Sequence, residues 1–445
     1  MRKWSALLLV LVVAGVAAWF LIRRPPPRWT SSSPAALAEF EQGLQAELKF
    51  YSEDAIAHYQ KALELDPDMA MAHLHLLTDM PKAKPEMAQQ VEALRRLRTL
   101  QDSRLTEREK LLIDYRLQRA DKENARAEKT LAAYLEKHPD DSWALAIRCG
   151  QAWQRHDWKA AEACNRGLIK ADPNWVQAQN QLGYIAMAEG RFAEAEQLFR
   201  TYLYIAPDQA NPHDSMGELL TLLGRYDDGE KQLEDAIRIR PTFCAAWEHL
   251  MLLHDLGGNN AKAHAVLDRL EHAGTCGKDF VERQRCRVET WDGVLSDDAK
   301  AAWDAAARLG CAGKGGAVSI LAYHAALQSG HRQEAASIEA DMHEHARLYG
   351  DDDPALVAIA LHLEGARLAA DGDDKGAVER FKGADSRLEY WSDTLGLFKL
   401  FNRLDLARSL KKSGDAKGAD DVLAEVRAIN ADFASRFAER HALEP

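Results

Sequence analysis

The sequence has little positive charge and few cysteines for its length. Its 445 residues include 57 Lys and Arg against 69 Asp and Glu, which gives a net charge of −12. Proteins that bind nucleic acid neutralise phosphates with an excess of cationic side chains, so we expect no nucleic-acid partner. Six cysteines are too few to build a disulfide scaffold of this size. Hydrophobic residues make up 47% of the chain, which indicates a large folded core rather than disorder.

Motifs of catalysis and metal binding are also missing. The sequence has no G-x-S-x-G nucleophile motif and no C-x-x-C pair. The glycine-rich residues 310–316 lack the Ser or Thr that follows the lysine of a phosphate-binding loop. His343 and His345 stand two positions apart, whereas the zinc-binding histidines of a metalloprotease helix stand four apart. We therefore predict no catalytic residue, no cofactor and no metal ligand, and a protein that is not an enzyme.

One long apolar run lies near the start of the chain. Residues 6–22 carry no charge and have basic residues on both sides. As a helix with a rise of about 1.5 Å per residue they would extend about 25 Å, the lower end of what crosses a bilayer. We predict a transmembrane helix that serves as a signal anchor, and the alternative is a cleaved signal peptide. Residues 23–35 contain three consecutive prolines and predict a stiff spacer.

The orientation of this segment is set by weaker signals. Basic residues flank the apolar run at both ends, so the positive-inside rule does not choose between the two sides. The signal-like order of the first residues favours a single-pass protein of the bacterial inner membrane, with its body in the periplasm. The alternative is a body held at the cytoplasmic face.

Proline recurs at a fixed interval in the middle of the chain. Pro139, Pro173, Pro207 and Pro241 follow one another at equal spacing, with a period of 34. Between successive prolines, apolar residues at helical spacing form two stripes separated by a turn. Such a period indicates a solenoid of helical hairpins, in which each unit buries its apolar face against its neighbours.

The residues of one repeat resemble the tetratricopeptide repeat. Leu182 and Gly183 stand in the first helix, Ala195 opens the second helix and Phe199 is the aromatic residue that follows it. The resemblance implies an all-α fold, a superhelical solenoid of antiparallel helix hairpins over residues 36–437. A membrane helix, a spacer and a repeat array are together similar to the exported tetratricopeptide repeat region of bacterial CadC-like regulators.

The cysteines can form disulfides if the body is exported. Cys149 and Cys164 fall within one hairpin, and Cys276 has Cys286 and Cys311 as candidate partners. The alternative is that the cysteines are buried free thiols, which pack as small hydrophobic groups.

Solenoids of this type bind partners on the concave face, which the first helices of successive repeats line. Here that face is expected to be polar and mildly acidic, without the Lys and Arg with which chaperone-tail binders of the family clamp a peptide carboxylate. We predict that it binds protein segments through amide hydrogen bonds and aromatic faces. The predicted protein-binding residues are Gln177, Asn180, Gln181, Tyr184, Asn211, Asp214, Glu218 and Trp247. The alternative is that these residues are solvated without binding a partner or face the core, because an error in register moves a residue off the face.

Two functions agree with this architecture. The first is a membrane-anchored scaffold or adaptor for protein–protein interactions, with other proteins as partners and the membrane contacted through the N-terminal helix. The alternative is a sensory or auxiliary subunit of a separately encoded membrane regulator, kinase or enzyme complex.

Overall fold

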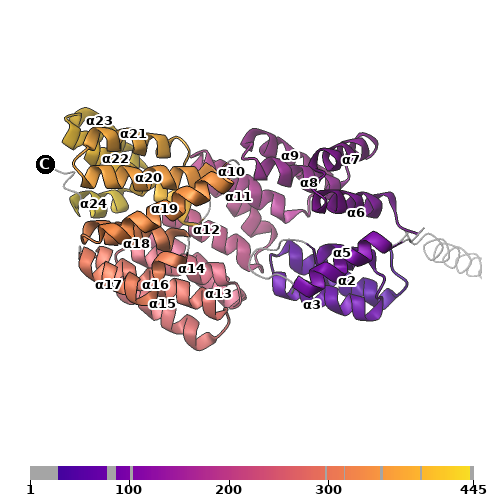
Figure 1. The fold of residues 1–445 in the computed structure, drawn as a ribbon. Coiled ribbons are helices and arrows are strands. Elements are labelled where there is room, and N and C mark those ends of the chain that lie inside the picture. Colours follow the sequence, from indigo (N-terminus) through magenta and orange to yellow (C-terminus); the bar gives the residue numbers. More distant parts are fainter. Residues whose placement is uncertain are drawn as a thin grey trace, which may run out of the picture. The chain divides into compact units, whose positions relative to one another are not determined.

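The described part of the chain is entirely helical. The computed structural model describes residues 29–77, 87–100, 104–295, 298–314, 316–350, 354–390 and 393–440. Within these ranges there are α-helices and one short 3₁₀ helix, Cys311–Lys314, and no β-strand (Figure 1). The predicted all-α helical-repeat fold is therefore confirmed. The chain forms two compact units, residues 1–145 and 146–445.

The first unit is built around a cluster of aromatic side chains. Trp29 packs edge-on against Phe40 and Trp143, with ring centroids 5.8 Å and 5.1 Å apart. Phe40 also contacts Tyr59, which lies across the first hairpin. The helices of this unit are α2 (Pro34–Leu48), α3 (Ser52–Leu65), α4 (Ala70–His75), α5 (Met87–Thr99), α6 (Glu107–Ala120) and α7 (Asn124–Lys137), and α8 (Ser142–Gln154) crosses its boundary with the second unit.

The second unit continues as helical hairpins in chain order. In each hairpin the two helices pack against each other, and each hairpin packs against the next; Figure 1 shows α22 and α23 beside α20 and α21. The helices are α9 (Trp158–Ala171), α10 (Val176–Ala188), α11 (Phe192–Ile205), α12 (Ala210–Leu222), α13 (Tyr226–Ile239), α14 (Cys244–Leu256), α15 (Asn260–Ala273), α16 (Lys278–Leu295), α17 (Ala299–Leu309), α18 (Gly316–Gln328), α19 (Arg332–Tyr349), α20 (Pro354–Ala370), α21 (Asp374–Asp385), α22 (Asp393–Ser413), α23 (Ala416–Ile429) and α24 (Ala431–Arg440).

A glycine opposite an aromatic ring sets the spacing of the helices within a hairpin. A Cβ added at Gly183 in α10 would lie 2.6 Å from Cδ1 of Phe199 in α11, far inside van der Waals contact. The same pair recurs with the same sequence spacing in other hairpins. Gly43 lies opposite Tyr59, and Gly365 of α20 lies opposite Phe381 of α21. Because the first helix has no side chain at this point, the two helix axes approach closely around the ring.

The turns between the helices of a hairpin also follow the repeat period. The turns after α10, α12 and α14 contain glycines with φ between +69° and +74°, a conformation that residues with a Cβ rarely adopt. These glycines are Gly190, Gly224 and Gly258.

The C-terminal part of the second unit packs onto these turns in chain order. Tyr390 lies on the first turn, Asn430 on the second and Arg436 on the third. The backbone N–H of Tyr390 also donates to the carbonyl of Ala188, at 3.4 Å. The Asn430 amide donates to the carbonyl of Leu222, at 3.1 Å. The second unit thus folds back on itself, and contacts between residues very distant in sequence hold its C-terminal part to the ends of α10 and α12.

We expect Asn430→Ala to destabilise this closure by about 2–3 kcal/mol. The fully buried side chain also caps α24, because its Oδ1 accepts the N–H of Phe433. Its removal leaves the carbonyl of Leu222 without the amide donor. Hydrogen exchange of α24 and urea unfolding measure the effect. The matched control is Asn174→Ala, at an exposed turn position, where a change below about 0.5 kcal/mol is expected. Unchanged exchange in α24 of the Asn430 variant would contradict the assignment.

All six cysteines form disulfides, and all lie in the second unit. The predicted pair Cys149–Cys164 is confirmed. The prediction for Cys276 is wrong, because this residue pairs with Cys244. The fully buried Cys286 and Cys311 pair with each other. The alternative of free thiols is therefore contradicted by the structure.

The described part of the chain contains no helix that is both long enough and apolar enough to cross a bilayer. Residues 6–22, where the sequence predicts a transmembrane helix, lie outside the described residues. Our localisation to the bacterial inner membrane, as a single-pass protein with a periplasmic body, is contradicted by this finding and is withdrawn. The predicted domain bounds at 23–35 and 36–437 stay predictions.

Candidate functional site

The predicted protein-binding residues lie on the first helices of three successive hairpins. Helix α10 carries Gln177, Asn180, Gln181 and Tyr184, while the others lie on α12 and α14. The structure brings Asn180, Tyr184 and Glu218 into one hydrogen-bond network, whereas the Trp247 ring lies against Arg269 of α15. These three helices contain neither Lys nor Arg, as the sequence analysis expected of this face. Whether the residues bind protein stays a prediction.

A polar network joins α10 to α12. The Tyr184 hydroxyl lies 2.7 Å from Oε2 of Glu218 and 3.2 Å from Oγ of Ser215. Ser215 in turn donates to Oδ1 of Asn180, at 2.9 Å. Burial and the nearby carboxylates raise the pKa of Tyr184 well above its ordinary value, so its hydroxyl stays protonated and donates to Glu218.

Other predicted residues are also used inside the molecule. Asp214 of α12 pairs with Nδ1 of His249 in α14, at 2.8 Å, and both are buried. The Asn211 amide donates to the Tyr202 hydroxyl, and the Trp247 indole N–H donates to a backbone carbonyl.

Five of the eight predicted residues are buried in this way: Asn180, Asn211, Asp214, Glu218 and Trp247. Gln177, Gln181 and Tyr184 are half-buried. The sequence indicates which helices carry the residues but does not reveal how closely successive first helices approach. All of the five buried residues except Trp247 therefore form hydrogen bonds between successive repeats.

Helix α22, from the C-terminal part of the second unit, packs at the C-terminal ends of these first helices. Leu397 of α22 lies with Met187, Leu222 and Leu252, which come from the C-terminal ends of α10, α12 and α14. The space left between them is about 10 Å³, at the lower limit for one water molecule. This end of the face is therefore filled by the protein itself.

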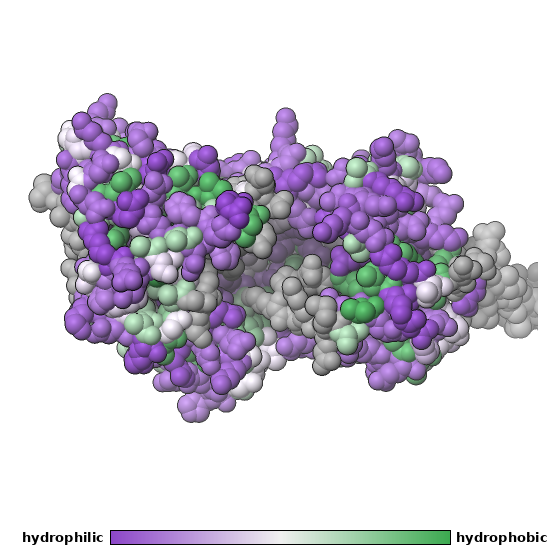
Figure 2. Space-filling view, in the orientation of Figure 1, coloured by the Kyte–Doolittle hydropathy of each residue, from purple (hydrophilic) through white to green (hydrophobic). Residues whose placement is uncertain are grey.

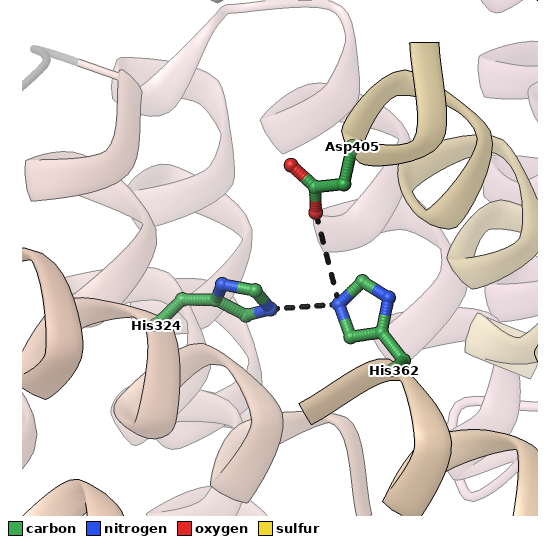
Figure 3. Close-up of side chains that lie close together, drawn as sticks. All are labelled: His324, His362 and Asp405. Atoms are coloured by element: carbon green, nitrogen blue, oxygen red, sulfur yellow. Dashed lines mark hydrogen bonds and ion pairs between the residues drawn. The ribbon is translucent and has the colours of Figure 1, made fainter. Parts of the chain in front are cut away.

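A second group of polar residues, which sequence analysis missed, lies on α18, α20 and α22. Nε2 of His324 lies 2.9 Å from Nε2 of His362, and the latter atom lies 3.8 Å from Oδ2 of Asp405. Figure 3 shows the three side chains converging from three different helices. The two histidines are 38 residues apart, close to one repeat. In the sequence, only the spacing of the two histidines by about one repeat could have indicated this cluster, because no short motif contains them.

Burial controls the charge of this cluster. Burial and the neighbouring His362 lower the pKa of His324 to about 4, and burial also lowers the pKa of His362. Both imidazoles are therefore neutral at pH 7. Burial opposes ionisation of Asp405, but the Arg408 guanidinium and, at the acidic pH where Asp405 titrates, the protonated histidines outweigh it and hold the pKa of Asp405 below its ordinary value. The cluster thus offers two neutral nitrogens and a carboxylate.

Antiparallel helix pairs that stack at the period of the repeat define a helical-repeat solenoid protein. Residues 176–209, which comprise α10, α11 and their turns, match the family model of the tetratricopeptide repeat. The chain is therefore a helical-repeat protein that contains a tetratricopeptide repeat. The match confirms the resemblance stated from Gly183, Ala195 and Phe199.

Two curated proteins share part of this sequence. A TPR repeat-containing protein of Pseudomonas aeruginosa is 32% identical over 108 residues, which are 24% of this chain. Tetratricopeptide repeat protein 7A of Homo sapiens is 33% identical over 156 residues, which are 34% of this chain. In each case the match spans 18% of the relative's own length. Neither relative bears on the resemblance to CadC-like regulators, which stays a prediction.

Two solved structures are similar to this chain at low sequence identity. A tetratricopeptide repeat protein from Parabacteroides merdae has a TM-score of 0.40 and 15% identity, with 60% of this chain and 98% of that chain covered. The APC/C hetero-tetramer Cut9–Hcn1 has a TM-score of 0.47 and 13% identity, with 91% of this chain and 76% of that chain covered.

Proposed function

We propose that the chain is a non-enzymatic adaptor for protein–protein interactions. In this proposal, the first-helix face of α10 and α12 binds a polypeptide segment of basic or amide character. The observation that carries the proposal is the charge of this face. Its three helices have no Lys or Arg, and Asp214 and Glu218, which are buried and hydrogen-bonded within the molecule, place negative charge just beneath its surface. Complementary charge steers and orients a partner segment more than it adds affinity.

The accessible part of this face is polar. Gln177 and Gln181 are half-buried on α10, and their amides can donate to and accept from a peptide backbone. In Figure 2, hydrophilic side chains also predominate over the visible surface of the C-terminal hairpins. Few large apolar side chains are exposed in the described part, and Tyr204, at 87%, is the most exposed of them. A polar contact surface of this kind is typical of partners that associate reversibly.

We expect Gln181→Arg to weaken partner binding at least tenfold, because it places a positive charge on a face that has none. The matched control is Gln197→Arg, an exposed position on α11, the second helix of the same hairpin. Affinity capture from native extract with quantitative mass spectrometry compares the two variants with the wild type. Equal recovery of the same partners by all three proteins would refute the assignment of this face.

A further inference from the structure

We propose that His324, His362 and Asp405 bind one divalent transition-metal ion of the zinc class, which ties α18, α20 and α22 together. The inference is independent of the proposed adaptor function and assigns a metal site to residues for which the sequence indicates none. Two imidazoles and a carboxylate form a donor set that zinc commonly takes, with solvent as the fourth ligand.

The distances between the donor atoms fit one ion. Two nitrogens bound at about 2.0 Å with a tetrahedral angle lie about 3.3 Å apart. The observed separations are 2.9 Å between the two Nε2 atoms and 3.8 Å from Nε2 of His362 to Oδ2 of Asp405, on either side of that value. All three donor atoms lie within 4.8 Å of one another. Small side-chain rotations therefore complete the site, and the helices need not move.

A second polar contact holds His362 in the tautomer that a metal needs. The Asn402 amide nitrogen donates to the carbonyl of Phe381, at 3.1 Å, so its Oδ1 is the atom that faces Nδ1 of His362, at 3.0 Å. Nδ1 must then carry the proton, which leaves the lone pair of Nε2 directed at His324 and Asp405. Histidines that bind metals are oriented in this way by an acceptor at the other ring nitrogen.

A pocket beside the cluster provides room for the fourth ligand. The pocket has a volume of about 200 Å³ and is lined by His324, Asp405, Arg408 and Ser409 among others. Ser409 is 1% exposed, and its Oγ has no hydrogen-bond partner among the residues that the structure describes. A metal-bound water in this pocket would give that hydroxyl a partner.

The cations near the site do not block it. Arg408 lies 3.3 Å from Oδ1 of Asp405, the other oxygen of the carboxylate, and so leaves Oδ2 for the ion. Arg408 and Lys412 both line the adjoining pocket. Their charge opposes a bare cation but favours hydroxide or another small anion as the fourth ligand.

The test is zinc binding to the full chain after removal of metal with a chelator. Isothermal titration calorimetry is expected to give one Zn²⁺ per chain, and Co²⁺ is expected to give the visible absorption of a tetrahedral site. His324→Gln and Asp405→Asn should each weaken binding at least tenfold and abolish the cobalt absorption. The matched control, His343→Gln, removes an exposed histidine on α19 and should leave both unchanged.

The proposal is overturned if the wild type binds no Zn²⁺, or if both site variants bind it as tightly as the wild type does. Circular dichroism establishes whether each variant is folded. Asp405→Asn preserves the shape of the side chain and decides the question alone if His324→Gln does not fold. Zinc should also raise the melting temperature of the wild type and of His343→Gln, but not of Asp405→Asn.

Discussion

Replacing Gly183 by alanine is expected to destabilise the second unit by about 2–3 kcal/mol. The new Cβ would lie 2.6 Å from Cδ1 of Phe199, whose ring is fully buried in the core. The clash outweighs the gain of about 1 kcal/mol that alanine normally brings to a helix interior. Urea unfolding followed by circular dichroism measures the change.

A double variant separates this clash from other effects of the substitution. Phe199→Leu alone leaves a cavity, but in combination with Gly183→Ala the smaller side chain makes room for the added methyl group. We expect the double variant to be more stable than the sum of the single effects predicts, by at least about 1 kcal/mol. The matched control is Gly167→Ala in α9, where an added Cβ meets nothing within 4 Å and should stabilise. Strict additivity would show that ring and glycine do not interact.

The parts of the fold that could be predicted from sequence are those set by contacts within one repeat. The close approach at Gly183 follows from a glycine at a fixed distance before an aromatic residue, and the structure places this kind of pair in both units. The Cys149–Cys164 disulfide was predictable for the same reason. Cys149 stands where other repeats have the glycine, and its partner lies within the same hairpin.

The return of the C-terminal part onto the first repeats could not be predicted in this way. Asn430 contacts the turn after α12, which is very distant in sequence, and no periodicity connects those two positions. Nothing in the local sequence distinguishes an asparagine that only caps its own helix from one that also donates a hydrogen bond to a turn far away in the sequence. The pairing of Cys276 with Cys244 failed as a prediction because the boundaries of that hairpin are irregular in sequence.

The two candidate sites also differ in how far the repeat pattern predicts them. The repeat register predicted that Asn180, Tyr184 and Glu218 lie close together, and the structure joins them in one hydrogen-bond network through Ser215. Asn180 and Glu218 are also buried, which the register did not predict. His324 and His362 were not predicted because the repeats around them have lost the proline marker and its regular period. Their convergence depends on how three hairpins stack, which is a tertiary property.

Reduction of the three disulfides is expected to remove most of the stability of the second unit and little of the first. Their loops close over 15, 32 and 25 residues and do not overlap in sequence. Loop-closure entropy assigns each about 3–4 kcal/mol. Because the loops are separate, these contributions add to about 10 kcal/mol, comparable to the net stability of a whole domain.

The first unit contains no cysteine and therefore serves as an internal control within the same molecule. Hydrogen exchange with and without a reductant should show loss of protection in α9–α24 and unchanged protection in α2–α7. Cys244–Cys276, whose sulfurs belong to half-buried residues, should be reduced before the fully buried Cys286–Cys311. If protection in the second unit survives complete reduction, the stacked hairpins alone supply its stability and the entropic estimate is wrong. If both units lose protection together, the two do not unfold independently.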